Sequence, residues 1–347
     1  MTRKKRWAFD MEDKPIYNAA LNANPVKEER RTLPDKKRNL GIFLLLILTF
    51  LIWSNSFIAI KVLLARMNAF DLLRLRFIPV AIISTGIVMV FYRKEAWQIV
   101  KAHPGRVTLG GLLMVISYNL FLNSGMKYVQ PNAASLLIAL NPLITLLLAV
   151  RFLREPFTPR RLFGTVLTFC GLTLVILLGR VGAGSGTWIA IDKVPYALLV
   201  LGGPLSWAAA TVIIKPALKN HSPLAFNFVS LAIGALPLIL FIDRPFLRLA
   251  FSLSLLETGA SAFLSLACTI LAYTFWNIAV KHWHASNVSL FVYLNPPLTA
   301  IFTYLFFGIG ITFYFFVGGS IMLAGIVLAT WPSKTIRPDE IIPDVGG

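Results

Sequence analysis

The sequence ASLLIALNPLIT at residues 134–145 has a second version 154 residues later, where residues 288–299 read VSLFVYLNPPLT. Leu-Asn-Pro stands at the same place in both stretches, inside runs that are otherwise mostly apolar. Apolar identities between two hydrophobic segments arise easily by chance, whereas a shared Asn-Pro pair does not. The two stretches therefore predict an internal duplication, from which the rest of the chain can be aligned outward.

The same offset pairs residues far outside these two stretches. The aligned pairs are Trp53 with Trp207, Lys61 with Lys215, Phe121 with Phe275, Asn123 with Asn277, Lys127 with Lys281, Ser135 with Ser289, Thr145 with Thr299, Phe152 with Phe306, Gly164 with Gly318 and Gly171 with Gly325. Because Trp, Asn, Lys and Gly recur at one offset without a gap, we infer that the chain consists of two related halves.

The composition predicts that both halves lie in a membrane. Of the 347 residues, 57% are hydrophobic and only 14% are charged, and the mean hydropathy is +0.73. The charges gather in short stretches between apolar runs of about twenty residues, the length at which a helix crosses a bilayer. These runs are apolar on every face, which excludes a barrel of alternating strands as well as disorder, collagen and coiled coil.

The predicted fold class is an all-α polytopic membrane protein with ten transmembrane helices. The expected helices are 40–60, 71–92, 107–126, 131–151, 161–179, 195–215, 224–242, 257–280, 286–307 and 310–331. Each repeat holds five helices, an odd number, so the second repeat must enter the membrane from the opposite side and the two repeats must be inverted. The expected organisation is a disordered basic tail (1–39), a first repeat (40–180), a connector (181–194), a second repeat (195–332) and a C-terminal tail (333–347).

The net charge of +18 indicates orientation in the membrane, because the basic residues flank apolar runs and form no stripe with aromatic residues. No nucleic-acid partner is therefore expected. With the N-terminus inside, 24 of the 33 Lys and Arg fall on the cytoplasmic side, so we expect both termini in the cytoplasm. The expected partners are the lipid bilayer and a small-molecule substrate, and the oligomeric state is left open.

No cofactor or metal site is predicted from the sequence. Cys170 and Cys268 both lie inside apolar runs, and His282 and His284 point to different faces of a helix with no Cys or acid close in sequence. The glycines between residues 182 and 186 lack the Gly-Lys-Ser or Gly-Lys-Thr that follows in a phosphate-binding loop.

Several motifs carry a resemblance to a known family. Lys61 follows Trp53 by eight residues, Leu75-Arg76-Phe77 opens the second helix, the run 134–145 leads to Phe152 and Glu155, and Gly164 and Gly171 lie in the fifth helix. Over roughly residues 40–331 this pattern resembles the drug/metabolite transporter superfamily, in particular its ten-helix EamA-type branch. The resemblance implies a transporter of the inner or plasma membrane, not an enzyme, with two five-helix halves around a central cavity, commonly exporting amino acids or other small metabolites. Ile309 stands where the first half has Glu155, so a role that needs an acid in both halves is not expected.

The prolines of the duplicated stretches predict breaks in the fourth and ninth helices. A proline inside a helix lacks its own N–H and displaces the carbonyl four residues earlier, here those of Ile138 and Val292. Hydrocarbon cannot satisfy these carbonyls, so we expect them either to line the substrate path or to be satisfied by neighbouring helices.

Polar and aromatic residues inside the runs are the candidate substrate-binding residues, since amides are unfavourable toward lipid and should face inward. Asn119 with Asn123, and Tyr273 with Asn277, lie four residues apart and share a helical face. The full candidate set is Trp53, Asn55, Arg76, Tyr118, Asn119, Asn123, Asn141, Trp207, Tyr273, Trp276, Asn277, Tyr293 and Asn295. Two alternatives stay open: hydrogen bonding between helices for the amides, and snorkelling or pairing with Asp71 for Arg76.

The positions of the ionisable residues predict how transport is driven. All fifteen acids and all four His fall in tails, loops or helix ends of the expected topology, so the expected spans lack a central proton carrier. We therefore expect alternating access by uniport or exchange, with sodium coupling through backbone carbonyls as an open alternative. The competing hypothesis is a non-transporting membrane protein, either an intramembrane enzyme or a scaffold.

Overall fold

The computed structural model describes residues 36–128, 134, 137–178, 194–307 and 313–330. The predicted tails and connector therefore lie wholly or almost wholly outside the described residues, as does Ile309. The chain divides into two compact units, Met1–Phe43 and Leu44–Gly347, and the contacts given below belong to the second unit. Within the described ranges, every regular element is helical.

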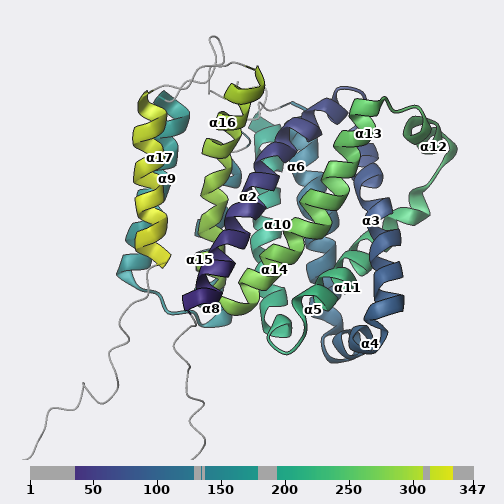
Figure 1. Cartoon of the computed structure of the whole chain (residues 1–347), viewed down its shortest axis with the longest axis horizontal. Helices are drawn as coiled ribbons and strands as arrows, with labels where there is room; N and C mark the ends of the chain where they lie inside the picture. Colours follow the sequence, from purple (N-terminus) through teal and green to yellow (C-terminus); the bar gives the residue numbers. More distant parts are fainter. Residues whose placement is uncertain (1–35, 129–133, 135–136, 179–193, 308–312, 331–347) are drawn as a thin grey trace, which may run out of the picture. The chain divides into compact units, whose positions relative to one another are not determined.

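The helices follow one another along the chain as shown in Figure 1. In the first half they are α2 (Lys36–Leu64), α3 (Ala69–Phe91), α4 (Arg93–Ala102), α5 (Pro104–Leu112), η1 (Leu113–Ser117), α6 (Tyr118–Met126), α8 (Asn141–Leu153) and α9 (Pro159–Leu178). In the second half they are α10 (Val194–Leu218), α11 (Pro223–Ala235), η3 (Leu236–Phe241), α12 (Arg244–Phe251), α13 (Leu255–Ala262), η4 (Phe263–Leu271), α14 (Ala272–His282), α15 (Ala285–Ser289), η5 (Leu290–Leu294), α16 (Asn295–Phe307) and α17 (Phe313–Thr330).

Six continuous helical stretches are long and apolar enough to cross a membrane. They are Arg38–Leu64, Ala69–Phe91, Pro104–Met126, Leu198–Leu218, Pro223–Phe241 and Leu255–His282. The other four expected spans fall on shorter or interrupted helices, or extend to residues outside the described ranges. The count of ten transmembrane helices therefore stays a prediction, while the helical, multi-span fold is confirmed.

Two short helices were not predicted, because their apolar faces are too short to register as spans. The first, α4, buries Ala96 and Ile99 and leaves Trp97 exposed, which is the pattern of a helix lying along a surface. The second, α12, begins where the carboxylate of Asp243 accepts a hydrogen bond from the backbone N–H of Phe246 at 2.8 Å.

The fourth and ninth helices are both broken at the duplicated Asn-Pro. Helix α8 begins at Asn141 and α16 begins at Asn295, so each proline occupies the second residue of its helix, where its missing N–H costs nothing. The predicted breaks are therefore confirmed.

A second pair of irregularities interrupts the third and eighth helices. Both η1 and η4 are π-helical, and η1 corresponds through the repeat offset to the last five residues of η4. Such turns inside α-helices often mark functional sites, because they leave backbone carbonyls without their usual partner.

Helices α9 and α17, the last of each repeat, lie side by side (Figure 1). A Cβ placed on Gly164 would lie 2.8 Å from the carbonyl oxygen of Gly325, and one on Gly171 would lie 2.6 Å from that of Gly318. These contacts run in opposite directions along the two helices, so the helices are antiparallel. The repeat offset converts each contact into the other, as a twofold axis perpendicular to the helices requires.

Candidate functional site

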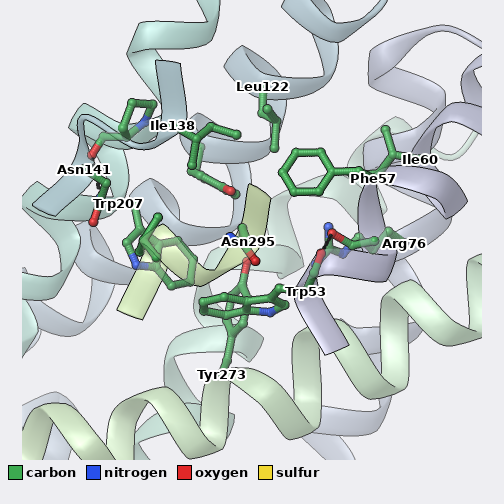
Figure 2. Close-up of a pocket in the computed structure, with 14 residues that line it drawn as sticks. Trp53, Phe57, Ile60, Arg76, Leu122, Ile138, Asn141, Trp207, Tyr273 and Asn295 are labelled. Carbon is green, nitrogen blue, oxygen red and sulfur yellow. Dashed lines mark hydrogen bonds between the residues drawn. The ribbon is translucent and has the colours of Figure 1, made fainter. Parts of the chain in front are cut away.

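One pocket opens among the helices of both repeats, with an empty space of about 560 Å³ including its mouth. Fourteen residues line it: Trp53, Ser56, Phe57, Ile60, Arg76, Tyr118, Leu122, Ile138, Asn141, Pro204, Trp207, Tyr273, Val292 and Asn295. Figure 2 shows Arg76 and Phe57 on one side, Asn141 and Trp207 on the other, and Asn295 with Trp53 between them.

The two helix breaks form part of the pocket wall. Asn141 and Asn295 line it, and so do Ile138 and Val292, the residues four positions before the two prolines. The Val292 carbonyl accepts a hydrogen bond from the backbone N–H of Asn295 instead. The amide nitrogen of Asn141 donates to the Pro204 carbonyl at 3.1 Å, whereas the buried Oδ1 of Asn295 has no partner among the described residues. The two equivalent amides therefore differ in hydrogen bonding, and the Oδ1 of Asn295 can accept a hydrogen bond from a ligand.

Aromatic rings pack together beside the breaks. The rings of Trp53 and Trp207, which the repeat offset pairs, meet edge to face with centroids 5.2 Å apart. Tyr273 lies 5.0 Å from Trp207, Tyr118 lies 5.1 Å from it, and the fully buried Trp276 packs behind at 5.5 Å. The Trp53 indole is oriented by a 2.9 Å hydrogen bond to the Cys268 carbonyl. The arrangement gives the pocket an aromatic, mostly apolar wall.

Arg76 is the single charged residue among the fourteen that line the pocket. It is 5% exposed, and its Nε donates to Thr269 Oγ1 at 2.8 Å while its Nη1 donates to Asn119 Oδ1 at 3.0 Å. Asp71 pairs with Arg74 instead, which also contacts Asp243 at 3.4 Å. The alternative of an Arg76–Asp71 pair is therefore wrong.

Seven of the thirteen predicted site residues line the pocket: Trp53, Arg76, Tyr118, Asn141, Trp207, Tyr273 and Asn295. The other six lie outside the lining. Asn119 accepts a hydrogen bond from Arg76, and Trp276 packs behind the aromatic wall. Asn55 donates to the Leu51 carbonyl, Asn277 donates to Asn227, and Asn123 and Tyr293 are buried elsewhere. The helical-face argument placed Asn123 and Asn277 in the site, but it could not tell which side of a buried helix faces the cavity.

The sequence reasoning did not single out Ser56, Phe57, Ile60, Leu122 or Pro204 as lining residues. Most of these are apolar residues within apolar runs and carry no separate signal. Ser56 and Ile60 lie three and seven residues after Trp53, so the helical period would have placed them on its face.

A second cluster surrounds Glu155, which the sequence places in a loop but the structure buries at 6% exposure. Arg154 ends α8 in the left-handed conformation, with φ of 52°, and the chain then turns Glu155 inward. Its carboxylate accepts hydrogen bonds from the backbone N–H of Ala285 at 2.7 Å and of Ser286 at 3.3 Å, and from the Ser286 hydroxyl. The loop after α8 is thereby joined to the start of α15.

Three basic residues surround the Glu155 carboxylate, of which Arg161 lies 3.9 Å away. Lys215 Nζ lies 3.6 Å from the Glu155 carboxylate and donates to the carbonyls of Val280 and Trp283, so its ammonium group is held inside the protein. His284 Nδ1 also lies 3.6 Å from Glu155, although no acid is close to it in sequence. Burial alone would raise the pKa of Glu155, but His284, the charge of Lys215 and the Ser286 hydroxyl together lower it to about 2. Glu155 is therefore ionised at neutral pH.

Comparison with known proteins shows the family to which the chain belongs. The profile of the EamA-like transporter family matches residues 39–177 and again 194–331. An "Uncharacterized transporter" of Archaeoglobus fulgidus is 28% identical over 296 residues, covering 83% of this chain and 96% of the relative. A "Probable terminal-alkyne amino-acid exporter" of Streptantibioticus cattleyicolor is 25% identical, covering 82% and 91%.

A solved structure, titled only "Crystal structure of protein", superposes with a TM-score of 0.65 at 20% identity over 84% of this chain and 96% of that one, which shows a shared fold. The family profile spans most of the chain in two copies, and the relatives are named as transporters. The chain is therefore a multi-pass membrane protein that belongs to the EamA-like transporter family.

Proposed function

We propose that this protein is a secondary transporter that exports a small metabolite, such as an amino acid or another amphipathic compound, by alternating access of two inverted halves. The observation that carries the proposal is the pocket at the two helix breaks. Its wall contains three pairs of residues that the repeat offset relates: Trp53 with Trp207, Ile138 with Val292, and Asn141 with Asn295. A binding site at the junction of two inverted repeats can be reached from either side in turn.

The antiparallel packing of α9 and α17 supports the inverted arrangement. Equivalent helices of two repeats that share one orientation in the membrane would run parallel, whereas the Gly164–Gly325 and Gly171–Gly318 contacts require opposite directions. The halves are then related by an axis in the membrane plane.

Different polar contacts hold the helices together at the two ends of the molecule, which supports alternating access. The continuous helix from Leu255 to His282 is about 40 Å long. Glu257 at its first end pairs with the partly exposed Arg66, while the carbonyl of Val280 at its other end accepts from the buried Lys215 of the Glu155 cluster. An exposed pair contributes little, so the Glu155 end is the more firmly closed.

The pocket lies nearer the Arg66 end. Its α2 residues reach Ile60, about one turn before that helix ends at Leu64, whereas its α10 residues stop at Trp207, two turns before Lys215. We therefore expect that in this state the site is closed toward Glu155 and approached from the Arg66 side. Under the predicted orientation, with both termini in the cytoplasm of an inner or plasma membrane, the Glu155 end faces the cytoplasm.

The charges around the pocket support uniport or exchange. No Asp, Glu or His belongs to its described lining, and Glu155, which is buried elsewhere, stays ionised at physiological pH because its pKa is lowered to about 2. The described lining of the pocket therefore supplies no carboxylate or imidazole that would take up and release a proton during transport.

Counterflow in proteoliposomes tests the proposal. Vesicles loaded with one unlabelled candidate should transiently accumulate its labelled form above the outside concentration, and empty vesicles should at most equilibrate it. With an imposed pH gradient, a clamped membrane potential and no sodium, we expect no uphill accumulation. Accumulation would show proton coupling and contradict the proposed energetics, and the lack of counterflow with a broad metabolite panel would return the protein to the non-transporting hypothesis.

A further inference from the structure

Arg76 is a buried cation that no acid neutralises. The ion pairs among the described residues involve Asp71, Glu155, Asp243 and Glu257, and Arg76 belongs to none of them. A buried, unpaired charge is costly, and natural proteins rarely keep one without a compensating partner. Its position in the pocket wall allows that partner to come from outside the protein.

The neighbours of Arg76 hold it in place without neutralising it. Thr269 Oγ1 donates its own proton to the Leu264 carbonyl at 2.8 Å, and Asn119 Nδ2 donates to the carbonyls of Met114 and Val115 at 3.0 Å. Thr269 and Asn119 therefore each present an oxygen to the guanidinium. The accepting carbonyls lie in η1 and η4, so the two π-helical segments build the support for Arg76.

One terminal nitrogen of Arg76 remains for a ligand. Nε and Nη1 are occupied by Thr269 and Asn119, and Nη2 makes no hydrogen bond to any described residue. The other polar groups of the lining, on Ser56, Tyr118, Asn141 and Asn295, are uncharged, so the site as a whole is cationic. An anion is attracted to such a site, and a cation is repelled from it.

The rest of the wall specifies the body of the ligand. Trp53, Trp207, Phe57 and Ile60 present rings and aliphatic groups, which suit an apolar or aromatic portion rather than a sugar or a phosphate chain. The Phe77 ring lies 5.0 Å from the Arg76 guanidinium carbon, so a ligand reaches the guanidinium at its edge. We propose that the transported molecule is a small carboxylate with an apolar body, whose carboxylate accepts a hydrogen bond from Nη2 of Arg76. This inference rests on the proposed function and names the substrate class of the same site. Amino acids with apolar side chains and simple monocarboxylates share this chemistry.

A matched set of probes tests the inference on the whole protein in nanodiscs. 3-Phenylpropanoate carries only the carboxylate, phenylalanine adds an ammonium, 2-phenylethylamine has only the ammonium, and 2-phenylethanol has neither. A second set with an isobutyl body, from 4-methylpentanoate and leucine to 3-methylbutylamine, varies the apolar portion. We expect at least one carboxylate of these sets to raise the unfolding temperature and to bind in calorimetry, while the amines and the alcohol do not. Comparing phenylalanine with 3-phenylpropanoate distinguishes an amino acid from a simple carboxylate.

Three variants give the residue-level test. Arg76→Gln should weaken carboxylate binding by about ten- to a hundredfold, because a hydrogen bond to a charged group is lost. Arg76→Lys keeps the charge but loses the forked geometry, so its binding should be intermediate. Arg66→Gln removes the same charge from a surface pair and should bind like the wild type.

The possible results separate the two proposals. Carboxylate binding that survives Arg76→Gln unchanged, equal binding of the amines, or no binding of any carboxylate would each overturn the inference. Counterflow of an amine or a neutral solute in the first two cases would leave the proposed transport function intact. If Arg76→Gln does not fold, the probe comparison on the wild type and on Arg76→Lys decides the question.

Discussion

Asn277 and Asn295 are both buried amides, but their side chains have different surroundings. Neither Oδ1 has a partner among the described residues, but Asn277 Nδ2 donates to the side-chain oxygen of Asn227 at 3.1 Å, whereas Asn295 lines the pocket. Removing a donor leaves a buried acceptor unsatisfied, while truncating an unpaired group does not. The two residues should therefore respond differently to the same substitution.

We predict that Asn277→Ala lowers the free energy of unfolding by about 1–3 kcal/mol with little change in the affinity of the folded protein for substrate. Asn295→Ala should leave stability nearly unchanged and weaken substrate binding. Thermal unfolding in detergent and binding in nanodiscs check the pair. Full binding by a well-folded Asn295→Ala variant would remove this amide from the site.

Three elements meet at Glu155: the end of α8, the end of α10 and the start of α15. Its pKa in the folded protein is about 2, below the ordinary value of 4.5. A depressed pKa contributes stability that is present above pH 4.5 and is lost as the pH falls toward 2. The difference corresponds to about 3 kcal/mol.

We predict that Glu155→Gln destabilises the protein at pH 7, because Lys215 is left buried without its carboxylate. The variant should also lose the part of the acid dependence between pH 4.5 and 2 that belongs to Glu155. Thermal unfolding across pH 3–7 measures both effects. Glu257→Gln at the other end is the control: its pair with Arg66 is partly exposed, and glutamine can keep the capping box, so it should lower the unfolding temperature far less than Glu155→Gln does.

Two glycines of helix α17 form a matched pair of positions for testing how α17 packs against α9. A Cβ on Gly325 would lie 2.6 Å from the Thr168 backbone nitrogen and 2.7 Å from the Gly164 carbonyl oxygen, whereas one on Gly319 would meet nothing within 4 Å. We predict that Gly325→Ala costs about 1–3 kcal/mol through overpacking. Gly319→Ala should be neutral or slightly stabilising, because alanine favours helices. Equal unfolding temperatures for the two variants would contradict this packing.

On the scale of the whole molecule, inversion of the halves predicts topology. If the five predicted spans separate the N-terminal tail from the connector, a cysteine at Ser185 should be labelled from outside the cell and one in the tail only after permeabilisation. Cys170 is exposed and should first be replaced by alanine, whereas Cys268 is buried. Labelling of both engineered positions from the same side would contradict the inverted arrangement.

The sequence by itself determined the helical membrane class, the duplication and the two helix breaks. Each rests on a local or periodic property: hydrophobic length, a constant offset, and the missing N–H of proline. These properties are independent of how the helices pack, so they can be read before any contact is known.

Which polar residues face the pocket, and which form hydrogen bonds or ion pairs between helices, is seen only in the packed structure. Asn277 and Asn295 are both mid-run amides in the sequence, yet the first bonds to another helix and the second lines the pocket. Glu155 lies 60 residues from Lys215 and about 130 from Ala285, and its burial arises from bringing those segments together. Side-chain direction and pairing between distant segments depend on helix rotation and packing, which neither hydropathy nor periodicity encodes for helices that are apolar all round.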